Sequence, residues 1–226
     1  MKKKYEVEIK SLLGNKENVE KLKSSLKKKY PLFKLLAEEK QLNHYFNIPA
    51  DLSLLIKNVE TLIPREKREE LGHILGYGQK MSIRTRDADK NVLLVIKASV
   101  GDDTSSNGVK RIEFESVVDA GLQALDKILL DSGCTYQAKW SREREEYGDD
   151  NMRVCIDRNA GYGYIAEFEK MTGDESLLED VRKGLLSAME SLGVAELPQD
   201  RLERMFAHYN SHWAEYYGTD KTFIIE

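Results

Sequence analysis

Carboxylates alternate with apolar residues in two short segments near opposite ends of the chain. Glu6 and Glu8 are separated by one valine, and Glu167 and Glu169 are separated by one phenylalanine. Successive side chains of a β-strand point to opposite faces, so both carboxylates of each pair are expected on one face. Carboxylates do not stabilise an apolar core, so such a face favours a polar site that binds cations.

Basic residues follow the same period of two in the segments between these pairs. Arg84 and Arg86, for example, are separated by one threonine. One solvated face of an ordinary antiparallel sheet gives the same alternation, but here it recurs in most of the candidate strands while their alternate positions are apolar. The charged residues that share the pattern are Lys10, Arg84, Arg86, Lys97, Arg111, Glu113, Glu115, Arg142, Arg144, Arg153 and Asp157.

If the sheet closes on itself, this charged face lines its interior. Burying so many charges is costly unless they pair with one another or match a ligand. Arginine and lysine bind phosphate oxygens, and carboxylates bind the metal ion that bridges the phosphates. The pattern therefore predicts a triphosphate together with Mg²⁺ or Mn²⁺ as the ligand.

Most of the elements that must position these residues are strands joined by short turns. Segments 89–90, 148–150 and 159–161 have the composition of hairpin turns. Hairpin connections do not fit a parallel βαβ fold, so we predict an α+β fold, an eight-stranded antiparallel β-barrel with flanking helices. The predicted strands are 5–11, 41–47, 81–88, 91–99, 109–118, 135–147, 151–158 and 162–170; the predicted helices are 15–29, a stretch from 51 that ends at Pro64, 119–130, 174–192 and 199–217; and 58–80 is predicted to be a long connection.

The composition is that of an ordinary globular domain. The chain has 226 residues without an obvious linker, so we expect one domain over 1–226. Charged residues make up 33% of the chain and hydrophobic residues 41%, which leaves enough apolar side chains for a normal core. The formal net charge of −4 lacks the basic excess that a general nucleic-acid binder shows.

Two features of the sequence bear on the compartment. Cys134 and Cys155 are the only cysteines, too few for a disulfide framework, so we expect buried thiols in a reducing compartment. The basic N-terminus lacks the apolar segment of a signal peptide, and no apolar run has the length of a membrane span. We therefore expect a cytoplasmic protein that does not act at a membrane.

Segment 6–10 (EVEIK) resembles the ExExK signature of the CYTH proteins, the triphosphate tunnel metalloenzymes, and the order of the later segments strengthens the resemblance. This family includes inorganic triphosphatases, thiamine triphosphatases and class IV adenylate cyclases. The resemblance covers roughly 3–193, and 194–226 is expected to be a C-terminal helical extension of the same domain. The matching segments are 41–47 (QLNHYFN), 83–86 (IRTR), 95–97 (VIK), 110–115 (KRIEFE), 142–147 (REREEY), and Asp157 followed by 161–163 (GYG) and 167–169 (EFE).

The resemblance implies an antiparallel tunnel in which acidic residues bind metal and basic strands bind the triphosphate. A water molecule held in this site is then expected to attack the terminal phosphorus. On this hypothesis, Glu113, Glu115 and Lys97 take part in catalysis. The implied metal ligands are Glu6, Glu8, Asp157, Glu167 and Glu169, and the implied substrate-binding residues are Lys10, Arg84, Arg86, Lys97, Arg111, Arg142 and Arg144.

Three functions remain open on the sequence alone. The first is a metal-dependent triphosphatase that hydrolyses tripolyphosphate or an organic or nucleoside triphosphate. The second is a class IV adenylate cyclase, and the third is a non-catalytic module that binds polyphosphate or nucleotide. Class IV cyclases often carry a His-Phe pair just before ExExK, and the absence of that pair here favours hydrolysis. The expected partner is a triphosphate-containing small molecule, with an RNA 5′-triphosphate end as the one nucleic-acid alternative, and the protein is expected to be a monomer or a homodimer.

The last predicted helix is rich in aromatic residues, among them Tyr209, Trp213, Tyr216 and Tyr217. We expect these rings to pack against the sheet. The alternative is that the helix covers one mouth of the tunnel, with Arg201 or Arg204 reaching in, or contacts a substrate base.

Overall fold

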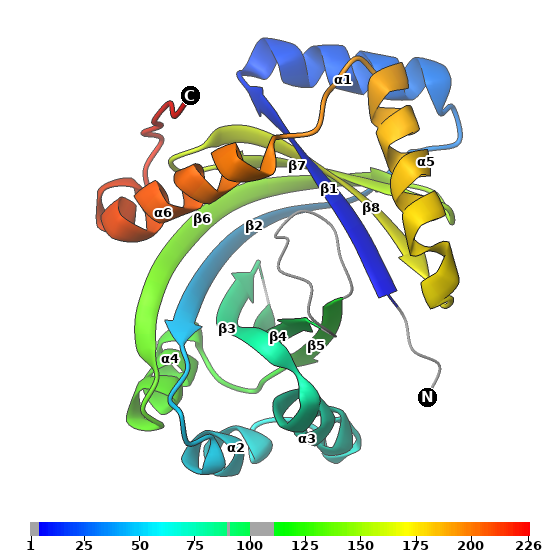
Figure 1. Ribbon diagram of the computed structural model, residues 1–226. Helices are drawn as coiled ribbons and strands as arrows, with labels where there is room; N and C mark the ends of the chain where they lie inside the picture. Colours follow the sequence, from blue (N-terminus) through cyan, green and yellow to red (C-terminus); the bar gives the residue numbers. More distant parts are fainter. Residues whose placement is uncertain (1–4, 90, 100–110) are drawn as a thin grey trace. The chain divides into compact units, whose positions relative to one another are not determined.

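The structure, a computed structural model, describes residues 5–89, 91–99 and 111–226, with only the backbone described for 79, 80, 99, 111 and 112. These residues form eight antiparallel strands, six α-helices and two short 3₁₀ helices (Figure 1), which confirms the predicted α+β class. The strands are β1 (Tyr5–Gly14), β2 (Lys34–Asn47), β3 (Gln79–Ala88), β4 (Asn91–Ser99), β5 (Arg111–Val117), β6 (Thr135–Gly148), β7 (Arg153–Asn159) and β8 (Gly163–Thr172). The helices are α1 (Lys16–Lys29), α2 (Ser53–Glu60), η1 (Arg65–Lys67), α3 (Arg68–Tyr77), α4 (Leu122–Asp131), η2 (Glu175–Leu177), α5 (Leu178–Ser191) and α6 (Gln199–Tyr216).

The chain divides into two compact units. Of the described residues, the first unit contains 5–40 and 142–226, and the second contains 41–89, 91–99 and 111–141. Strands β2 and β6 each run through a unit boundary, so each contributes residues to both units. The single domain over 1–226 stays a prediction.

The first unit contains an antiparallel sheet in the order β1-β8-β7-β6, with helices α1 and α5 packed on its apolar face. Helix α1 begins at the predicted cap, because the Asn15 side chain accepts a hydrogen bond from the backbone of Asn18. Its apolar stripe of Val19, Leu22 and Leu26 is buried, and three lysines occupy its last turn, where cations stabilise a helix. This core fixes which face of the sheet remains polar.

The second unit contains the antiparallel sheet β2-β3-β4-β5, with α2, α3 and α4 packed on its apolar face. The prediction of a long connection over 58–80 was wrong, because this segment contains η1 and α3. Leu71, Ile74 and Leu75 form a buried stripe on α3, while Gly72 and Gly76 lie on its exposed side. Tertiary packing of the stripe therefore outweighs the helix-weakening effect of the two glycines.

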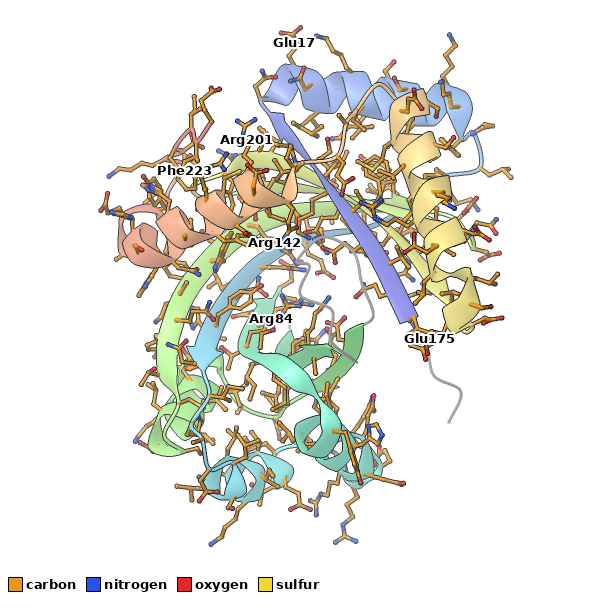
Figure 2. All side chains as sticks on the ribbon, in the orientation of Figure 1. Glu17, Arg84, Arg142, Glu175, Arg201 and Phe223 are labelled. Atoms are coloured by element: carbon orange, nitrogen blue, oxygen red, sulfur yellow. The ribbon has the colours of Figure 1, made fainter. Side chains whose placement is uncertain are left out.

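The C-terminal segment is attached to the turn between β7 and β8. Gly161 has a positive φ of 85°, and its backbone exchanges hydrogen bonds with the strand-like segment at Lys221 and Phe223. A Cβ atom at this glycine would lie 2.7 Å from the ring of Tyr209, which is fully buried. Figure 2 labels Arg201, which belongs to α6, and Phe223, which belongs to the C-terminal segment. The aromatic side chains of α6 thus pack within the first unit.

Arg201 and Arg204 are engaged with the end of the chain. They donate hydrogen bonds to the backbone carbonyls of Ile225 and Glu226, respectively. No helix in the part of the chain that the structure describes is long and apolar enough to cross a membrane.

Candidate functional site

The first strand has the two faces that the sequence predicts. Tyr5, Val7 and Ile9 are buried in β1, and the charged residues between them are partly exposed on the opposite face. Strand β8 pairs antiparallel with β1, and its Phe168 is fully buried opposite Ile9. The carboxylates of both strands therefore share the polar face of the first unit.

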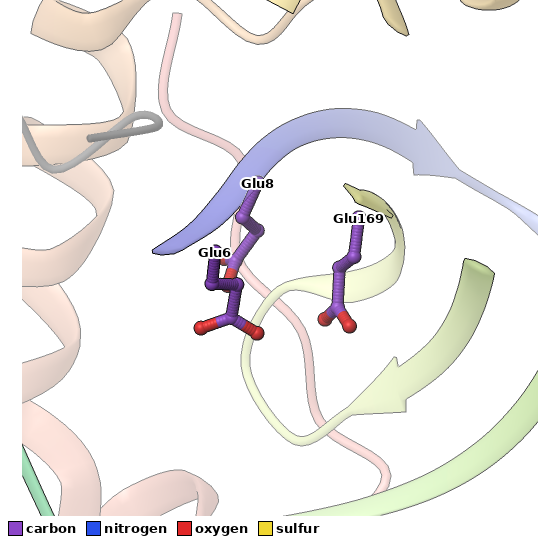
Figure 3. A group of neighbouring side chains, drawn as sticks. All are labelled: Glu6, Glu8 and Glu169. Carbon is purple, nitrogen blue, oxygen red and sulfur yellow. The ribbon is translucent and has the colours of Figure 1, made fainter. Parts of the chain in front are cut away.

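Three of these carboxylates form a group, which we call the acidic group: Glu6, Glu8 and Glu169. One oxygen from each lies within 4.8 Å of the others, and Figure 3 shows the three side chains gathered between β1 and β8. Glu8 and Glu169 are direct partners in the β1–β8 register. Like charges directly opposite each other destabilise a sheet, so a bound cation is the natural compensation. Three carboxylate oxygens at this spacing are suitable ligands for a divalent ion.

Lys10 joins the acidic group to a second set of charges. Its ammonium contacts Glu8 and donates a hydrogen bond of 2.8 Å to Oε1 of Glu167, its partner in the register. A single lysine thus faces two carboxylates.

Asp157, on β7, binds two arginines of β6. Arg144 donates to both of its oxygens at 2.7 Å, and Arg142 donates to Oδ2 at 2.8 Å. Arg144 also contacts Glu167. We call these five residues (Lys10, Arg142, Arg144, Asp157 and Glu167) the buried ion network, since only 1% of the Asp157 side chain is exposed.

Two members of this network, Glu167 and Arg144, have strongly perturbed pKa values. Burial alone would raise the pKa of Glu167, but Lys10, Arg144 and Arg142 outweigh burial and hold that pKa well below its ordinary value. Burial would lower the pKa of Arg144, but Asp157 and Glu167 raise it above its ordinary value. Each ion therefore keeps the other charged.

The structure separates the predicted metal ligands into two sets. Glu6, Glu8 and Glu169 form the acidic group, whereas Asp157 and Glu167 direct their oxygens to arginine and lysine. The predicted phosphate ligands Lys10, Arg142 and Arg144 are the residues that they contact. The pairing within this face depends on strand register, which the period of two does not reveal.

The second unit carries a set of basic residues on the face opposite its core, and we call Arg84, Arg86 and Lys97 the basic group. Glu113 lies between two of them, 3.1 Å from Nζ of Lys97 and 3.5 Å from Arg84. Burial would raise the pKa of Glu113, but Lys97 and Arg84 outweigh burial and lower it. The carboxylate is therefore a weak proton acceptor that holds the two cations in place.

Two polar residues that the sequence analysis did not select also contact the basic group. Arg84, labelled in Figure 2, donates a hydrogen bond of 2.6 Å to the hydroxyl of Tyr45, and Arg86 donates one of 3.0 Å to Oδ1 of Asn43. Arg86 also pairs with Glu115 at 3.1 Å. The sequence of segment 41–47 could have revealed these two residues, because strand alternation places Asn43 and Tyr45 on the face opposite Phe46.

The structure describes Arg111 and Cys155 to different extents. Arg111 lies in β5, but its side chain falls outside the described residues. Cys155 is a buried free thiol, as expected, but it is the register partner of Glu167 and so lies on the charged face. Burial raises the pKa of this thiol, which keeps it neutral.

A family model supplies the identification. The model described as the CYTH domain matches residues 74–201, more than half of the chain. The chain belongs to the CYTH family. CYTH proteins include triphosphatases and adenylate cyclases, and they act on triphosphates with the help of divalent metal ions. No curated protein is significantly similar to the chain in sequence.

Solved structures show the CYTH fold. The PH1819 protein from Pyrococcus horikoshii has a TM-score of 0.61 at 20% identity over 88% of this chain and 99% of that one. A candidate adenylate cyclase from Vibrio parahaemolyticus has a TM-score of 0.60 at 15% identity, covering 90% and 98%. A candidate adenylyl cyclase from Hippeastrum, described as having a dominant triphosphatase activity, has a TM-score of 0.50 at 15% identity, covering 90% and 96%. At these identities the likeness concerns the fold, and this CYTH chain has the eight-stranded antiparallel tunnel fold of α+β class.

Proposed function

We propose that this CYTH protein is a triphosphatase that depends on Mg²⁺ or Mn²⁺ and hydrolyses a triphosphate-containing small molecule. The observation that carries the proposal is the acidic group, in which Glu8 and Glu169 oppose each other directly in the sheet and Glu6 lies beside them. Lys10 supplies one positive charge to Glu8, and binding of a divalent ion accounts for the gathering of three carboxylates.

The acidic group would hold the metal ion. Carboxylate oxygens are the ligands that Mg²⁺ and Mn²⁺ prefer, and Mg²⁺ is usually bound by a few carboxylates together with substrate phosphates and water. When bound, the ion would neutralise charge on the phosphates and polarise the terminal phosphoryl group. Glu113 and Glu115, which lie in the second unit, are not proposed as ligands of this ion. They are proposed to position basic side chains and to orient water.

The basic group would bind the phosphates. Arginine binds phosphate through paired hydrogen bonds, and lysine supplies a compact charge that neutralises an oxygen. Lys97 and Arg84 share one carboxylate, Glu113, so their positions are fixed before any substrate arrives. Such preorganised charges stabilise the negative charge that develops on the transferring phosphoryl group.

Water is the proposed nucleophile at the terminal phosphorus. Glu113 is held ionised by its neighbours, so its proposed role is to position Lys97 and to orient water rather than to remove a proton completely. Glu115, paired with Arg86, would position that arginine in the same way. Phosphoryl transfer needs little covalent chemistry from the protein, so positioning and charge are sufficient for the reaction.

In the buried ion network, Asp157 and Glu167 are proposed to position Lys10, Arg142 and Arg144. Because Asp157 accepts three hydrogen bonds from two arginines, it fixes the direction of both guanidinium groups. We assign the reaction to the cytoplasm, which fits the two free buried thiols. A small-molecule triphosphate is the proposed substrate, with an RNA 5′-triphosphate end as the alternative.

A cyclase is the second candidate, because the Vibrio parahaemolyticus neighbour is described as a candidate adenylate cyclase. A cyclase directs a ribose hydroxyl to the α-phosphorus, whereas a triphosphatase directs water to the terminal phosphorus. The two reactions give different products from the same ATP. Product analysis therefore separates them.

The test is to incubate the purified full chain with tripolyphosphate, ATP or thiamine triphosphate, with Mg²⁺, with Mn²⁺ or with a chelator. Released phosphate, pyrophosphate and cyclic AMP are resolved by chromatography. We expect metal-dependent release of phosphate from at least one substrate. Pyrophosphate together with cyclic AMP from ATP would replace the proposal with the cyclase, and binding without turnover would leave only a binding module.

The variant Glu169→Gln tests the role of the acidic group in turnover. We expect at least an approximately 100-fold loss, because even the outer-shell partners of metal ligands contribute about 10- to 100-fold to activity. The matched control is Glu143→Gln on β6, an exposed carboxylate that pairs with Lys40 and Arg158. Wild-type turnover in Glu169→Gln would refute the metal assignment.

A further inference from the structure

Two aromatic side chains of the second unit, Tyr45 and Trp140, lie beside the basic group, and we call them the aromatic pair. Their ring centroids are 6.2 Å apart, with planes inclined by 56°. Tyr45 is itself in contact with Arg84, whose guanidinium carbon lies 5.4 Å from the centre of its ring and whose Nη1 donates to its hydroxyl. An unbroken series of contacts therefore connects Trp140 to the residues proposed to bind phosphate.

Core packing does not explain the aromatic pair. His44 and Phe46 precede and follow Tyr45 in β2, and both are buried on the opposite face, where Phe46 packs against Tyr136. Among the described residues of the second unit, the apolar core includes Phe46 and Tyr136 but neither member of the pair. Both rings are only half-buried. Their placement on the charged face calls for another explanation.

One explanation is that the aromatic side chains hold Arg84 in place, and this explanation accounts for Tyr45, which contacts Arg84 directly. It does not account for Trp140, which contacts Tyr45 through its ring. An indole presents a large flat π surface that stacks on heteroaromatic rings and attracts cationic ones. Stacking on such side chains tolerates different bases because every base has a π face.

We infer that the triphosphate substrate carries a flat heteroaromatic group and that Trp140, supported by Tyr45, stacks on it. This inference rests on the proposed function, because it takes the phosphates to be bound by Arg84 and Lys97. It narrows the substrate class from any triphosphate to a nucleoside triphosphate or one with a comparable ring, such as a thiazolium or pyrimidine. Tripolyphosphate, which lacks such a group, would use the basic group alone.

The test compares three ligands on wild type, Trp140→Ala and Trp140→Phe by calorimetry. Methylene-bridged analogues of ATP, thiamine triphosphate and tripolyphosphate are used with Mg²⁺, because they resist hydrolysis. In Trp140→Ala, we expect at least about fivefold weaker binding of a heteroaromatic ligand, the factor that corresponds to the lower end of measured base–aromatic stacking. Binding of the tripolyphosphate analogue should be unchanged, and Trp140→Phe should retain most of the affinity because it keeps a π face.

Tryptophan fluorescence gives an independent readout, because Trp140 and Trp213 are the only tryptophans. In Trp213→Phe, the remaining indole should be quenched by the ATP or thiamine analogue but not by the tripolyphosphate analogue. In Trp140→Phe, this selective quenching should disappear.

Several outcomes overturn the inference and leave the proposed function standing. One is binding of the tripolyphosphate analogue alone, another is equal weakening of all three ligands in Trp140→Ala, and a third is no weakening of any ligand. If wild type binds none of the three ligands, the proposed function fails and the inference fails with it. The ATP and thiamine arms also identify which heteroaromatic class is bound.

Discussion

The charged faces of the two units differ in how their carboxylates are used. In the first unit, Asp157 is 1% exposed and is fully engaged by two arginines, while the acidic group gathers three carboxylates. In the second unit, Glu113 keeps 29% of its side chain exposed and lies between Lys97 and Arg84. The first face is therefore suited to binding a cation at the acidic group, beside the buried ion network. The second face is suited to binding an anion at the basic group.

The largest expected effect is on the free energy of unfolding, and it should differ between Asp157 and Glu113, which lie on the charged faces of the first and second units. Asp157→Asn should lower the free energy of unfolding by about 3–5 kcal/mol, because removing one partner of a buried ion pair leaves charges uncompensated. Glu113→Gln should cost about 1 kcal/mol or less, since its partly exposed pair resembles surface pairs. Urea unfolding measures both. Equal losses would show that the two networks do not differ in their structural role.

Arg84→Ala should weaken triphosphate binding at least about tenfold, because a hydrogen bond to a charged group contributes about 1.5–3 kcal/mol. Lys127→Ala, which removes an exposed lysine paired with Asp131 on α4, is the matched control. Tyr45→Phe should give a smaller loss, because it removes the hydroxyl that accepts from Arg84 and keeps the guanidinium. Calorimetry with the bridged tripolyphosphate analogue measures all three. Unchanged affinity in Arg84→Ala would exclude this residue as a phosphate ligand.

Acid should destabilise the first unit through Glu167, whose folded-state pKa is lowered chiefly by Lys10 and Arg144 against the effect of burial. A carboxylate with a lowered folded pKa stabilises the protein above its unfolded pKa of about 4.3, and this stabilisation is lost as the pH falls through the folded value. The stability difference between wild type and Glu167→Gln should therefore be largest near neutral pH and shrink below about pH 4. Thermal unfolding across pH measures it, and a difference that grows in acid would contradict the assignment.

The smallest expected effect concerns the acidic group without metal. Glu8 and Glu169 oppose each other in the register, and like charges in that arrangement destabilise a sheet. Glu169→Gln should therefore raise the free energy of unfolding by about 0.2–1 kcal/mol in a chelator. A lower unfolding free energy than that of wild type under these conditions would show that Glu169 stabilises the metal-free protein in spite of its repulsion with Glu8.

The sequence was sufficient to predict which residues share a face. The period of two predicted that Glu6 and Glu8 share one face of β1 and that Glu167 and Glu169 share one face of β8, because side-chain alternation is a local property of a strand. It did not predict that Asp157 would bind Arg142 and Arg144 instead of lying in the acidic group. That choice depends on the β6–β7 register, which is set by the type and length of the hairpin turn and not by the alternation within either strand.

The fold shows the same division between local and tertiary information. Helix α1 was predicted because its cap and apolar stripe are local, whereas α3 was missed because Gly72 and Gly76 weaken the local signal and packing supplies the compensation. Tyr45 and Trp140 were missed as site residues because aromatic side chains carry no charge to follow along the strands. The contact of Tyr45 with Arg84 connects the aromatic pair to the basic group.

Isothermal titration calorimetry with Mn²⁺, in the absence of any triphosphate, is the most direct test of the division of roles between the acidic and basic groups. We predict that wild type, Arg84→Ala and Glu143→Gln bind Mn²⁺ equally, and that Glu169→Gln binds at least about tenfold more weakly because it loses a charged ligand. Equal Mn²⁺ affinity in Glu169→Gln and wild type, or an equal loss in Glu169→Gln and Arg84→Ala, would contradict this division.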